Sequence, residues 1–133
     1  AMSMIPTSTG AAKAVAQVIP ALKGKLDGMA VRVPTPNVSL VDLTCEVGRE
    51  TSVEEVNAAL KVAAQGPLKD SMGFSEEPLV SCDYIGSIYG GVVDGLCTSV
   101  INGTMVKLII WYDNESGFTN QLVRLLRMMG KNL

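Results

Sequence analysis

The segment Thr7-Ser8-Thr9-Gly10 places three hydroxyl side chains and a glycine directly before an apolar stretch with helical spacing. A helix N-terminus offers unpaired N–H groups and a partial positive charge, so a hydroxyl and an open backbone there suit a phosphate-like anion. The alternative is that Thr9 is an ordinary N-cap, which is the commoner role of such a residue. From these residues alone both interpretations remain open.

Arg32 and Asn114 are two further polar residues in positions where ligand binding is plausible. Arg32 lies between Val31 and Val33, so its guanidinium either reaches solvent at a sheet edge or is held for a planar anion. Asn114 follows an apolar stretch and precedes a helical pattern. An asparagine in that place usually caps the backbone, but it can instead hold a ligand that carries an amide.

The sequence offers few of the residues that most often perform catalysis. It has no histidine, so it lacks the commonest general base and the commonest zinc ligand. Cys45, Cys82 and Cys97 are widely spaced in apolar, strand-like surroundings without a neighbouring cation, so we interpret each as a structural thiol. No GxGxxG motif opens a helix after a strand. We therefore expect binding residues here, and neither a catalytic residue, a metal site nor a dinucleotide pyrophosphate site.

The composition indicates a single folded domain of mixed α and β structure. Of 133 residues, 47% are hydrophobic, 18% charged and only 5% aromatic, which is ample aliphatic material for one packed core. The net charge of −2 and the absence of a basic run argue against nucleic acid as a partner. The apolar stretches are too short to span a bilayer, and the odd cysteine count fits a reducing compartment. We expect a soluble, cytoplasmic protein.

Three helices are expected from the periodicity. The first begins near Gly10 and is interrupted by Pro20. The second begins at Ser52, which forms a capping-box pattern with Glu55, and stops at Gly66-Pro67. The third closes the chain, with Asn114 or Ser116 as its cap, and its apolar face carries Phe118, Leu122, Leu125 and Met129.

The strands are expected from alternation and from turn residues. Val41, Leu43, Cys45 and Val47 alternate with polar residues and are predicted to face inward. Asn102-Gly103 is a strong signal for a two-residue hairpin turn. The expected strands are Met29–Val33, Ser39–Val47, an edge strand over Leu79–Tyr84, Val92-Val93 with Cys97–Ile101, and Met105–Tyr112.

Three segments that occur in order along the chain carry a family resemblance. They are Pro6-Thr7-Ser8-Thr9-Gly10-Ala11-Ala12-Lys13, then Met29-Ala30-Val31-Arg32-Val33-Pro34-Thr35-Pro36-Asn37-Val38, then Trp111-Tyr112-Asp113-Asn114-Glu115. Together they resemble glyceraldehyde-3-phosphate dehydrogenase, and the likeness runs the whole length of the sequence. The fold that this resemblance implies is α+β, with a mixed, largely antiparallel sheet and helices packed on one face, usually in a homotetramer.

The resemblance also implies roles for four residues. Thr9 and Gly10 match the Thr-Gly pair that binds inorganic phosphate or the substrate's phosphate, and Arg32 matches the substrate-phosphate arginine. Asn114 matches the asparagine that hydrogen-bonds the nicotinamide carboxamide of NAD. The implied reaction is the oxidation and phosphorylation of glyceraldehyde 3-phosphate to 1,3-bisphosphoglycerate in glycolysis. In it a cysteine thiolate attacks the aldehyde, hydride passes to NAD, and phosphate releases the acyl group.

Two departures from the family pattern bear on these expectations. Ser116 stands where the family usually has Trp, and Phe118 stands where Tyr is often found. In addition, the family's Ser-Cys-Thr-Thr-Asn nucleophile segment, its general-base histidine and its Rossmann domain are not among these residues. We therefore expect residues 1–133 to be the C-terminal part of the catalytic domain and to be inactive in isolation. The alternatives are an erythrose-4-phosphate dehydrogenase and, for the isolated chain, a non-catalytic assembly module.

Overall fold

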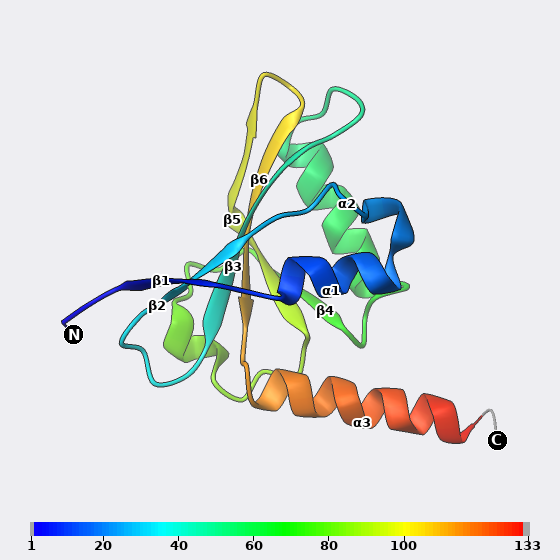
Figure 1. The fold of residues 1–133 in the computed structure, drawn as a ribbon. Helices are drawn as coiled ribbons and strands as arrows, with labels where there is room; N and C mark the ends of the chain where they lie inside the picture. Colours follow the sequence, from blue (N-terminus) through cyan, green and yellow to red (C-terminus); the bar gives the residue numbers. More distant parts are fainter. Residues whose placement is uncertain (1, 132–133) are drawn as a thin grey trace. The chain divides into compact units, whose positions relative to one another are not determined.

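The computed structural model describes residues 2–131 and divides the chain into two compact units, Ala1–Pro36 and Asn37–Leu133 (Figure 1). This division differs from the single packed core that the composition led us to expect. The first unit is an antiparallel two-stranded ribbon whose strands are separated in sequence by a helix. Its elements are β1 (Ile5–Ser8), α1 (Ala11–Val18), the 3-10 helix η1 (Pro20–Leu22) and β2 (Met29–Arg32).

The helix of this first unit begins and ends where the sequence predicts. Gly10 precedes the first turn of α1, and Ile19 follows the last. The helix stops there because Pro20 has no N–H and its ring disfavours a helical conformation at the residue before it. β2 then covers most of the strand that was expected over Met29–Val33.

The second unit is built on a four-stranded sheet with the strand order β3-β6-β5-β4. The pairs β3–β6 and β6–β5 are antiparallel, and β4–β5 is parallel. The helix α2 packs against β4 and β5. The expected α+β fold with a mixed, largely antiparallel sheet is therefore confirmed. The elements are β3 (Ser39–Glu46), α2 (Val53–Gln65), β4 (Met72–Ser75), the 3-10 helix η2 (Ser81–Tyr84), β5 (Gly91–Ile101), β6 (Met105–Tyr112) and α3 (Ser116–Gly130).

The long hairpin β5–β6 forms at the predicted place with a loop one residue longer than predicted. Ile101 pairs with Met105, so three residues separate the strands. Asn102 and Gly103 have φ angles of 51° and 72°, the left-handed conformation that asparagine and glycine tolerate best. The pairing is irregular between Asp94 and Ser99, and the intervening residues bulge from the ladder.

The predicted edge strand over Leu79–Tyr84 was wrong. Ser81–Tyr84 forms η2 instead, because the carboxylate of Asp83 accepts the Val80 N–H and the Asp83 N–H returns to the Val80 carbonyl. These two bonds close a tight turn that an extended strand cannot adopt. The edge strand next to β5 is β4, which the sequence analysis did not predict.

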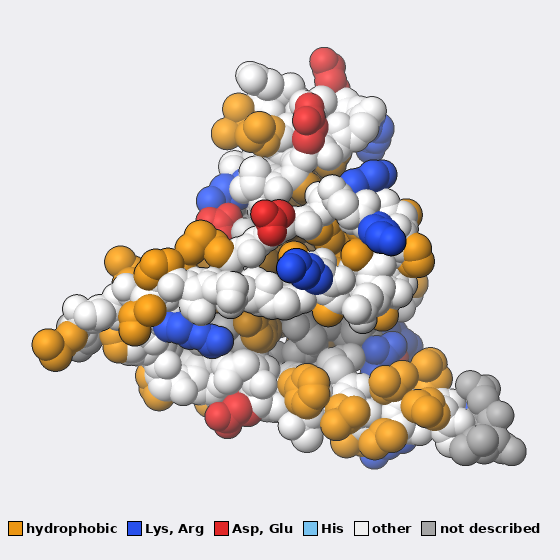
Figure 2. All heavy atoms as spheres, viewed as in Figure 1, with side chains coloured by type: hydrophobic (Ala, Val, Ile, Leu, Met, Phe, Trp, Pro, Cys, Tyr) orange, Lys and Arg blue, Asp and Glu red, His pale blue; other side chains and the backbone are white. Residues whose placement is uncertain are grey.

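Few large apolar side chains are fully covered in the described part of the chain. Tyr84 and Trp111 stack with 5.6 Å between their ring centroids, beside buried Val38 and Val92. The predicted alternation holds for Leu43 and Cys45 on β3 and for Val47 just after it, all of which are partly buried, but Val41 is exposed. Figure 2 shows that apolar side chains also gather along α3, where the residues of the predicted apolar face are exposed: Phe118, Leu122, Leu125 and Met129.

Candidate functional site

Thr9 and Gly10 lie at the N-terminus of α1, as the sequence predicts. The Thr9 hydroxyl oxygen accepts a hydrogen bond from the Ala11 N–H at 3.2 Å, so Thr9 caps the first N–H of the helix although Gly10, and not Thr9, occupies the N-cap position. That bond uses a lone pair of the hydroxyl and leaves its proton available to donate. Capping the helix and binding an anion are therefore compatible roles for this side chain.

Gly10 has no internal reason to be glycine in this structure. Its φ of −84° and ψ of −6° are allowed to any residue, and a Cβ added there would meet no atom within 4 Å. The position is exposed and its backbone is open to approach. An approaching ligand would account for the glycine, because a side chain would stand between that ligand and the peptide.

Arg32 is exposed at the last position of β2, and within the described residues its side chain forms no ion pair or hydrogen bond. In the register of β1 with β2, Arg32 lies opposite Ile5 and Ala30 lies opposite Thr7. Arg32 and Thr7 therefore share one face of the ribbon. The Met29–Ser8 pair, where the chain turns toward α1, is three register positions from Arg32, which is about 10 Å along the strand. Thr9-Gly10 and Arg32 thus lie in one unit, at opposite ends of the ribbon.

Asn114 lies in the second unit, between the end of β6 and the start of α3, and is exposed. Its side-chain amide has no hydrogen-bond partner in the described part of the chain. It borders an open hollow of about 300 Å³ that is also lined by Phe118, Tyr112 and Gln121. An amide without an internal partner beside an aromatic ring suits a flat, amide-bearing ligand.

Asp113, the residue before Asn114, is 2% exposed and accepts four hydrogen bonds. Its Oδ1 accepts the N–H groups of Glu115 and Ser116, each at 2.8 Å, and its Oδ2 accepts the Gly86 N–H at 2.8 Å and the Asn37 side-chain amide at 3.0 Å. These bonds, led by the one from Gly86, lower the pKa of the Asp113 carboxyl despite its burial. The predicted cap of α3 by Asn114 or Ser116 was therefore wrong, because Asp113 accepts the first free N–H groups of that helix.

The environments of the three cysteines differ from the apolar, strand-like surroundings that were predicted. All are free thiols, and Cys82 and Cys97 are exposed, in η2 and in the β5 bulge, while Cys45 is partly buried. Desolvation and then the neighbouring Asp94 raise the pKa of the Cys97 thiol, which disfavours its reactive thiolate. Among residues 2–131 no group of three or more potential metal-binding side chains occurs.

Comparison with known proteins gives a consistent answer. Residues 1–114 match the family described as glyceraldehyde 3-phosphate dehydrogenase, C-terminal domain. The chain belongs to this family. It is 62% identical over 125 residues to glyceraldehyde-3-phosphate dehydrogenase of Geobacillus stearothermophilus, covering 94% of the chain and 37% of the relative. It is 60% identical over 131 residues to glyceraldehyde-3-phosphate dehydrogenase 1 of Bacillus subtilis (strain 168), covering 98% and 39%.

A more distant relative agrees with these two. The glyceraldehyde-3-phosphate dehydrogenase of Schistosoma mansoni is 52% identical over 129 residues, which cover 97% of the chain and 38% of the relative. The chain thus spans about two fifths of the length of the relatives it matches. No helix that the structure describes combines the length and apolar character needed to cross a membrane.

The resemblance to glyceraldehyde-3-phosphate dehydrogenase implied a role for Asn114 but none for the residues around it, Asp113, Asn37 and Gly86. Of these, only Asp113 carried a usable signal, because an aspartate just before a helix is a frequent partner of its first N–H groups. Gly86 and Asn37 are 27 and 76 residues from Asp113 in sequence. No local pattern connects residues at such separations, so these contacts required the structure.

Proposed function

We propose that this chain is the C-terminal part of the catalytic domain of an NAD-dependent, phosphorylating glyceraldehyde-3-phosphate dehydrogenase. In this proposal Thr9, Gly10 and Arg32 bind the phosphate groups of glyceraldehyde 3-phosphate and of inorganic phosphate. Asn114 binds the carboxamide of the nicotinamide. The whole enzyme is a cytoplasmic homotetramer that acts in glycolysis, and its nucleophile, its general base and its Rossmann domain belong to a part of the protein outside these residues.

The proposal rests mainly on the accessibility of Thr9, Gly10 and Arg32, the three candidates for phosphate binding. They lie in one unit, all are accessible, and neither the Gly10 backbone nor the Arg32 guanidinium is used by another described side chain. The separation along the ribbon favours two positions for phosphate, one at the start of α1 and one at Arg32. A reaction that joins a phosphorylated substrate to a second phosphate needs two such positions.

The surroundings of Asn114 fit the nicotinamide end of NAD. Its amide can both donate to and accept from a carboxamide, and the ring of Phe118 borders the same hollow. Bound NAD would supply the hydride acceptor for the oxidation. In this proposal the chain orients the carboxamide and binds the phosphates, and it supplies neither the nucleophile nor the general base.

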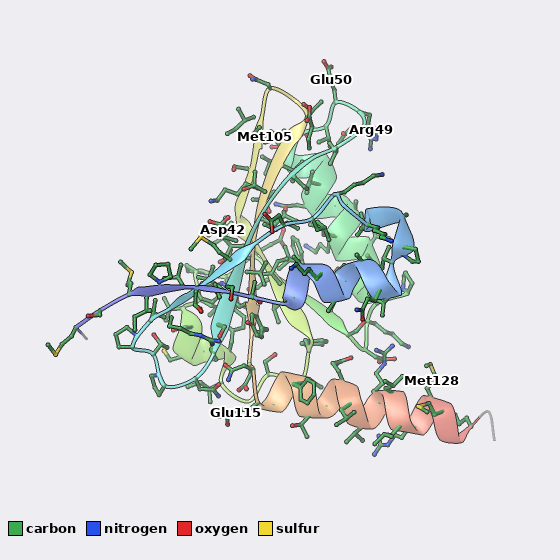
Figure 3. All side chains as sticks on the ribbon, in the orientation of Figure 1. Asp42, Arg49, Glu50, Met105, Glu115 and Met128 are labelled. Atoms are coloured by element: carbon green, nitrogen blue, oxygen red, sulfur yellow. The ribbon has the colours of Figure 1, made fainter. Side chains whose placement is uncertain are left out.

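The test uses the full-length dehydrogenase that contains this chain. Arg32→Leu is expected to raise KM for glyceraldehyde 3-phosphate by tenfold or more, since a charged hydrogen bond to phosphate contributes about 1.5–3 kcal/mol. Asn114→Ala is expected to raise KM for NAD instead. Arg49→Leu is the matched control. Arg49 is also exposed, it forms an ion pair with Glu55, and it lies at the opposite end of the second unit from Glu115 (Figure 3).

Two outcomes would contradict the proposal. An Arg32→Leu enzyme with an unchanged KM for glyceraldehyde 3-phosphate would remove Arg32 from the phosphate site. A higher kcat/KM for erythrose 4-phosphate than for glyceraldehyde 3-phosphate in the unmodified enzyme would assign the chain to a different dehydrogenase.

A further inference from the structure

The orientation of Asn114 is set entirely through its backbone. Its side chain is exposed and makes no hydrogen bond to any residue in the range 2–131, so nothing holds the amide directly before a ligand arrives. A side chain of this kind binds well only when its Cα–Cβ bond already points toward the ligand. What fixes residues 113–116 therefore decides how well Asn114 can bind.

The Asp113 carboxylate holds that segment from both sides. Oδ1 accepts the N–H groups of Glu115 and Ser116, which closes a turn around Asn114. Oδ2 accepts N–H groups from Gly86 and from the Asn37 side chain, which belong to two other parts of the second unit. All four donors are within 3.0 Å, and the carboxylate is almost fully buried.

Gly86 forms a second bond to the same segment. Its carbonyl oxygen accepts a hydrogen bond from the Ser116 hydroxyl at 3.2 Å, while its N–H donates to Asp113. Its φ of +84° is unfavourable for residues with a side chain, so the loop can hold this conformation because residue 86 is glycine. Ser116, at the position where the family usually has Trp, thus takes part in the attachment.

We propose that Asp113 is a positioning residue for Asn114: its carboxylate fixes the turn that presents the Asn114 amide to the nicotinamide carboxamide. This inference rests on the proposed function of Asn114. It assigns to Asp113 no contact with the cofactor and no part in the chemistry. Its effect should therefore be confined to recognition of the carboxamide.

Asp113→Asn in the full-length enzyme is the principal test. An asparagine has one acceptor oxygen and one NH₂ group, so in either orientation two of the four N–H donors face another donor. The readout is Kd for 3-acetylpyridine adenine dinucleotide, in which a methyl group replaces the amide NH₂, divided by Kd for NAD, both measured by isothermal titration calorimetry. We expect this ratio to fall about tenfold, the size of one lost neutral hydrogen bond, in both Asp113→Asn and Asn114→Ala.

Asp94→Asn is the matched structural control. Asp94 is 4% exposed, one of its oxygens accepts two backbone N–H groups, and the other accepts the indole N–H of Trp111. The substitution disturbs an equally buried carboxylate that does not bond to residues 113–116. Its cofactor ratio should equal that of the unmodified enzyme, even if the protein is less stable.

Two further variants keep the inference testable. Asn37→Ala removes only one of the four donors, so it should lower the ratio in the same direction by a smaller factor, even if Asp113→Asn fails to fold. In the Asn114→Ala background, Asp113→Asn should leave the ratio unchanged, because the side chain that Asp113 positions is gone.

The possible failures are distinguishable. If Asn114→Ala leaves the ratio unchanged, the proposed role of Asn114 is wrong. If Asn114→Ala lowers the ratio and Asp113→Asn and Asn37→Ala do not, only the positioning role of Asp113 is overturned. A fall of equal size in Asp94→Asn would also overturn it, because general loss of stability would then explain the result.

Discussion

The carboxylate of Asp94 on β5 accepts a hydrogen bond from the indole N–H of Trp111 on β6, with 3.1 Å between Oδ2 and Nε1. Asp94 is only 4% exposed, so water is a poor substitute for this donor. The Trp111 ring in turn stacks on Tyr84 of η2. The hydrogen bond therefore fixes a ring within the sheet, and that ring joins the sheet to the 3-10 turn that was predicted to be a strand.

Trp111→Phe is expected to lower the free energy of unfolding of the 133-residue chain by about 1–3 kcal/mol, since it leaves a buried acceptor without a donor. Urea unfolding followed by circular dichroism measures the change. Tyr112→Phe is the control, because its hydroxyl has no partner among the described residues and its loss should change stability by about 0.5 kcal/mol or less. Equal losses in the two variants would show that the indole N–H contributes little.

Much of the fold could be predicted because its signals are local. Ser52 accepts the Glu55 N–H at 3.2 Å and begins α2 as the capping pattern indicated. The second half of the predicted capping box is replaced, since the Glu55 carboxylate accepts from Thr51 and Arg49. β4 was not predicted because four residues are too few to show a period. Its pairing with β5, in which Met72 lies opposite Gly91, also leaves no signal in the local sequence.

The candidate site was predictable only one residue at a time. The sequence placed Thr9 and Gly10 at a helix start, Arg32 on a strand and Asn114 after one, and the structure agrees with each placement. The separation of Thr9-Gly10 from Arg32 along the ribbon depends on the register of β1 with β2, which no local pattern determines.

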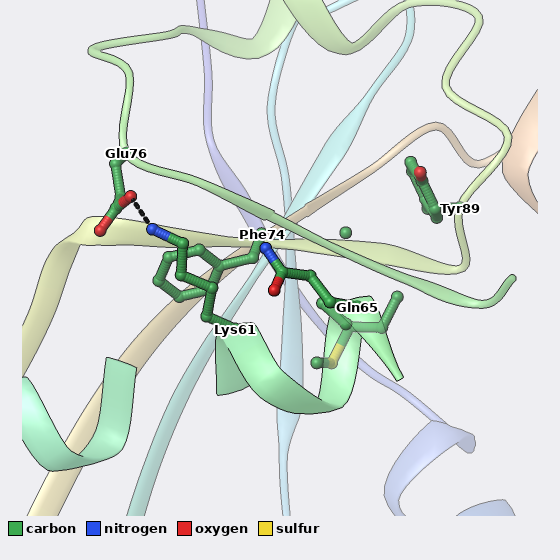
Figure 4. A pocket seen from close by; sticks show the side chains of 8 residues that line it. Lys61, Gln65, Phe74, Glu76 and Tyr89 are labelled. Carbon is green, nitrogen blue, oxygen red and sulfur yellow. Dashed lines mark hydrogen bonds and ion pairs between the residues drawn. The ribbon is translucent and has the colours of Figure 1, made fainter. Parts of the chain in front are cut away.

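A pocket of about 200 Å³ beside α2 was also unpredicted. It is lined by Phe74, Tyr89 and the Lys61–Glu76 ion pair, among others (Figure 4).

The lowered pKa of Asp113 predicts how its contribution to stability depends on pH. A carboxyl whose pKa is lower in the folded than in the unfolded state stabilises the fold above the unfolded value, about 3.9 for aspartate. That stabilisation is lost as the pH falls through the folded-state pKa. Between about pH 6 and pH 2, the stability of the wild-type chain should therefore fall more steeply than that of Asp113→Asn. If the free energies of unfolding of the two proteins change with pH in parallel across this range, the pKa of Asp113 is the same in the folded and unfolded states.

The raised pKa of Cys97 predicts slow reaction with electrophiles, although the residue is exposed. Desolvation, the hydrogen bond to Asp94 and the negative charge of Asp94 all disfavour the thiolate, which is the reactive form. Iodoacetamide at about pH 8.5, near the usual thiol pKa, should label Cys97 more slowly than an unstructured peptide of the same local sequence. Asp94→Asn should increase the rate. Peptide mass spectrometry distinguishes Cys97 from Cys82 and Cys45, and an unchanged rate in Asp94→Asn would remove Asp94 as the cause.

The exposed apolar face of α3 predicts that the 133-residue chain self-associates. Phe118, Leu122 and Leu125 recur at helical spacing along one face of α3, and each is at least 43% exposed. An apolar strip of this kind is unusual on a monomer, and a second copy of the chain can cover it in a closed, symmetric contact.

Light scattering across a tenfold concentration range measures this association. The average mass of the wild-type chain should rise with concentration, whereas Leu122→Glu with Leu125→Glu should stay at the monomer mass, because a charge in the contact would have to be desolvated. Val62→Glu is the control, since Val62 is 68% exposed on α2 and is not part of this strip. A wild-type mass that remains monomeric at the highest concentration would contradict self-association. Association that persists in the double variant and is lost in Val62→Glu would move the contact from α3 to α2.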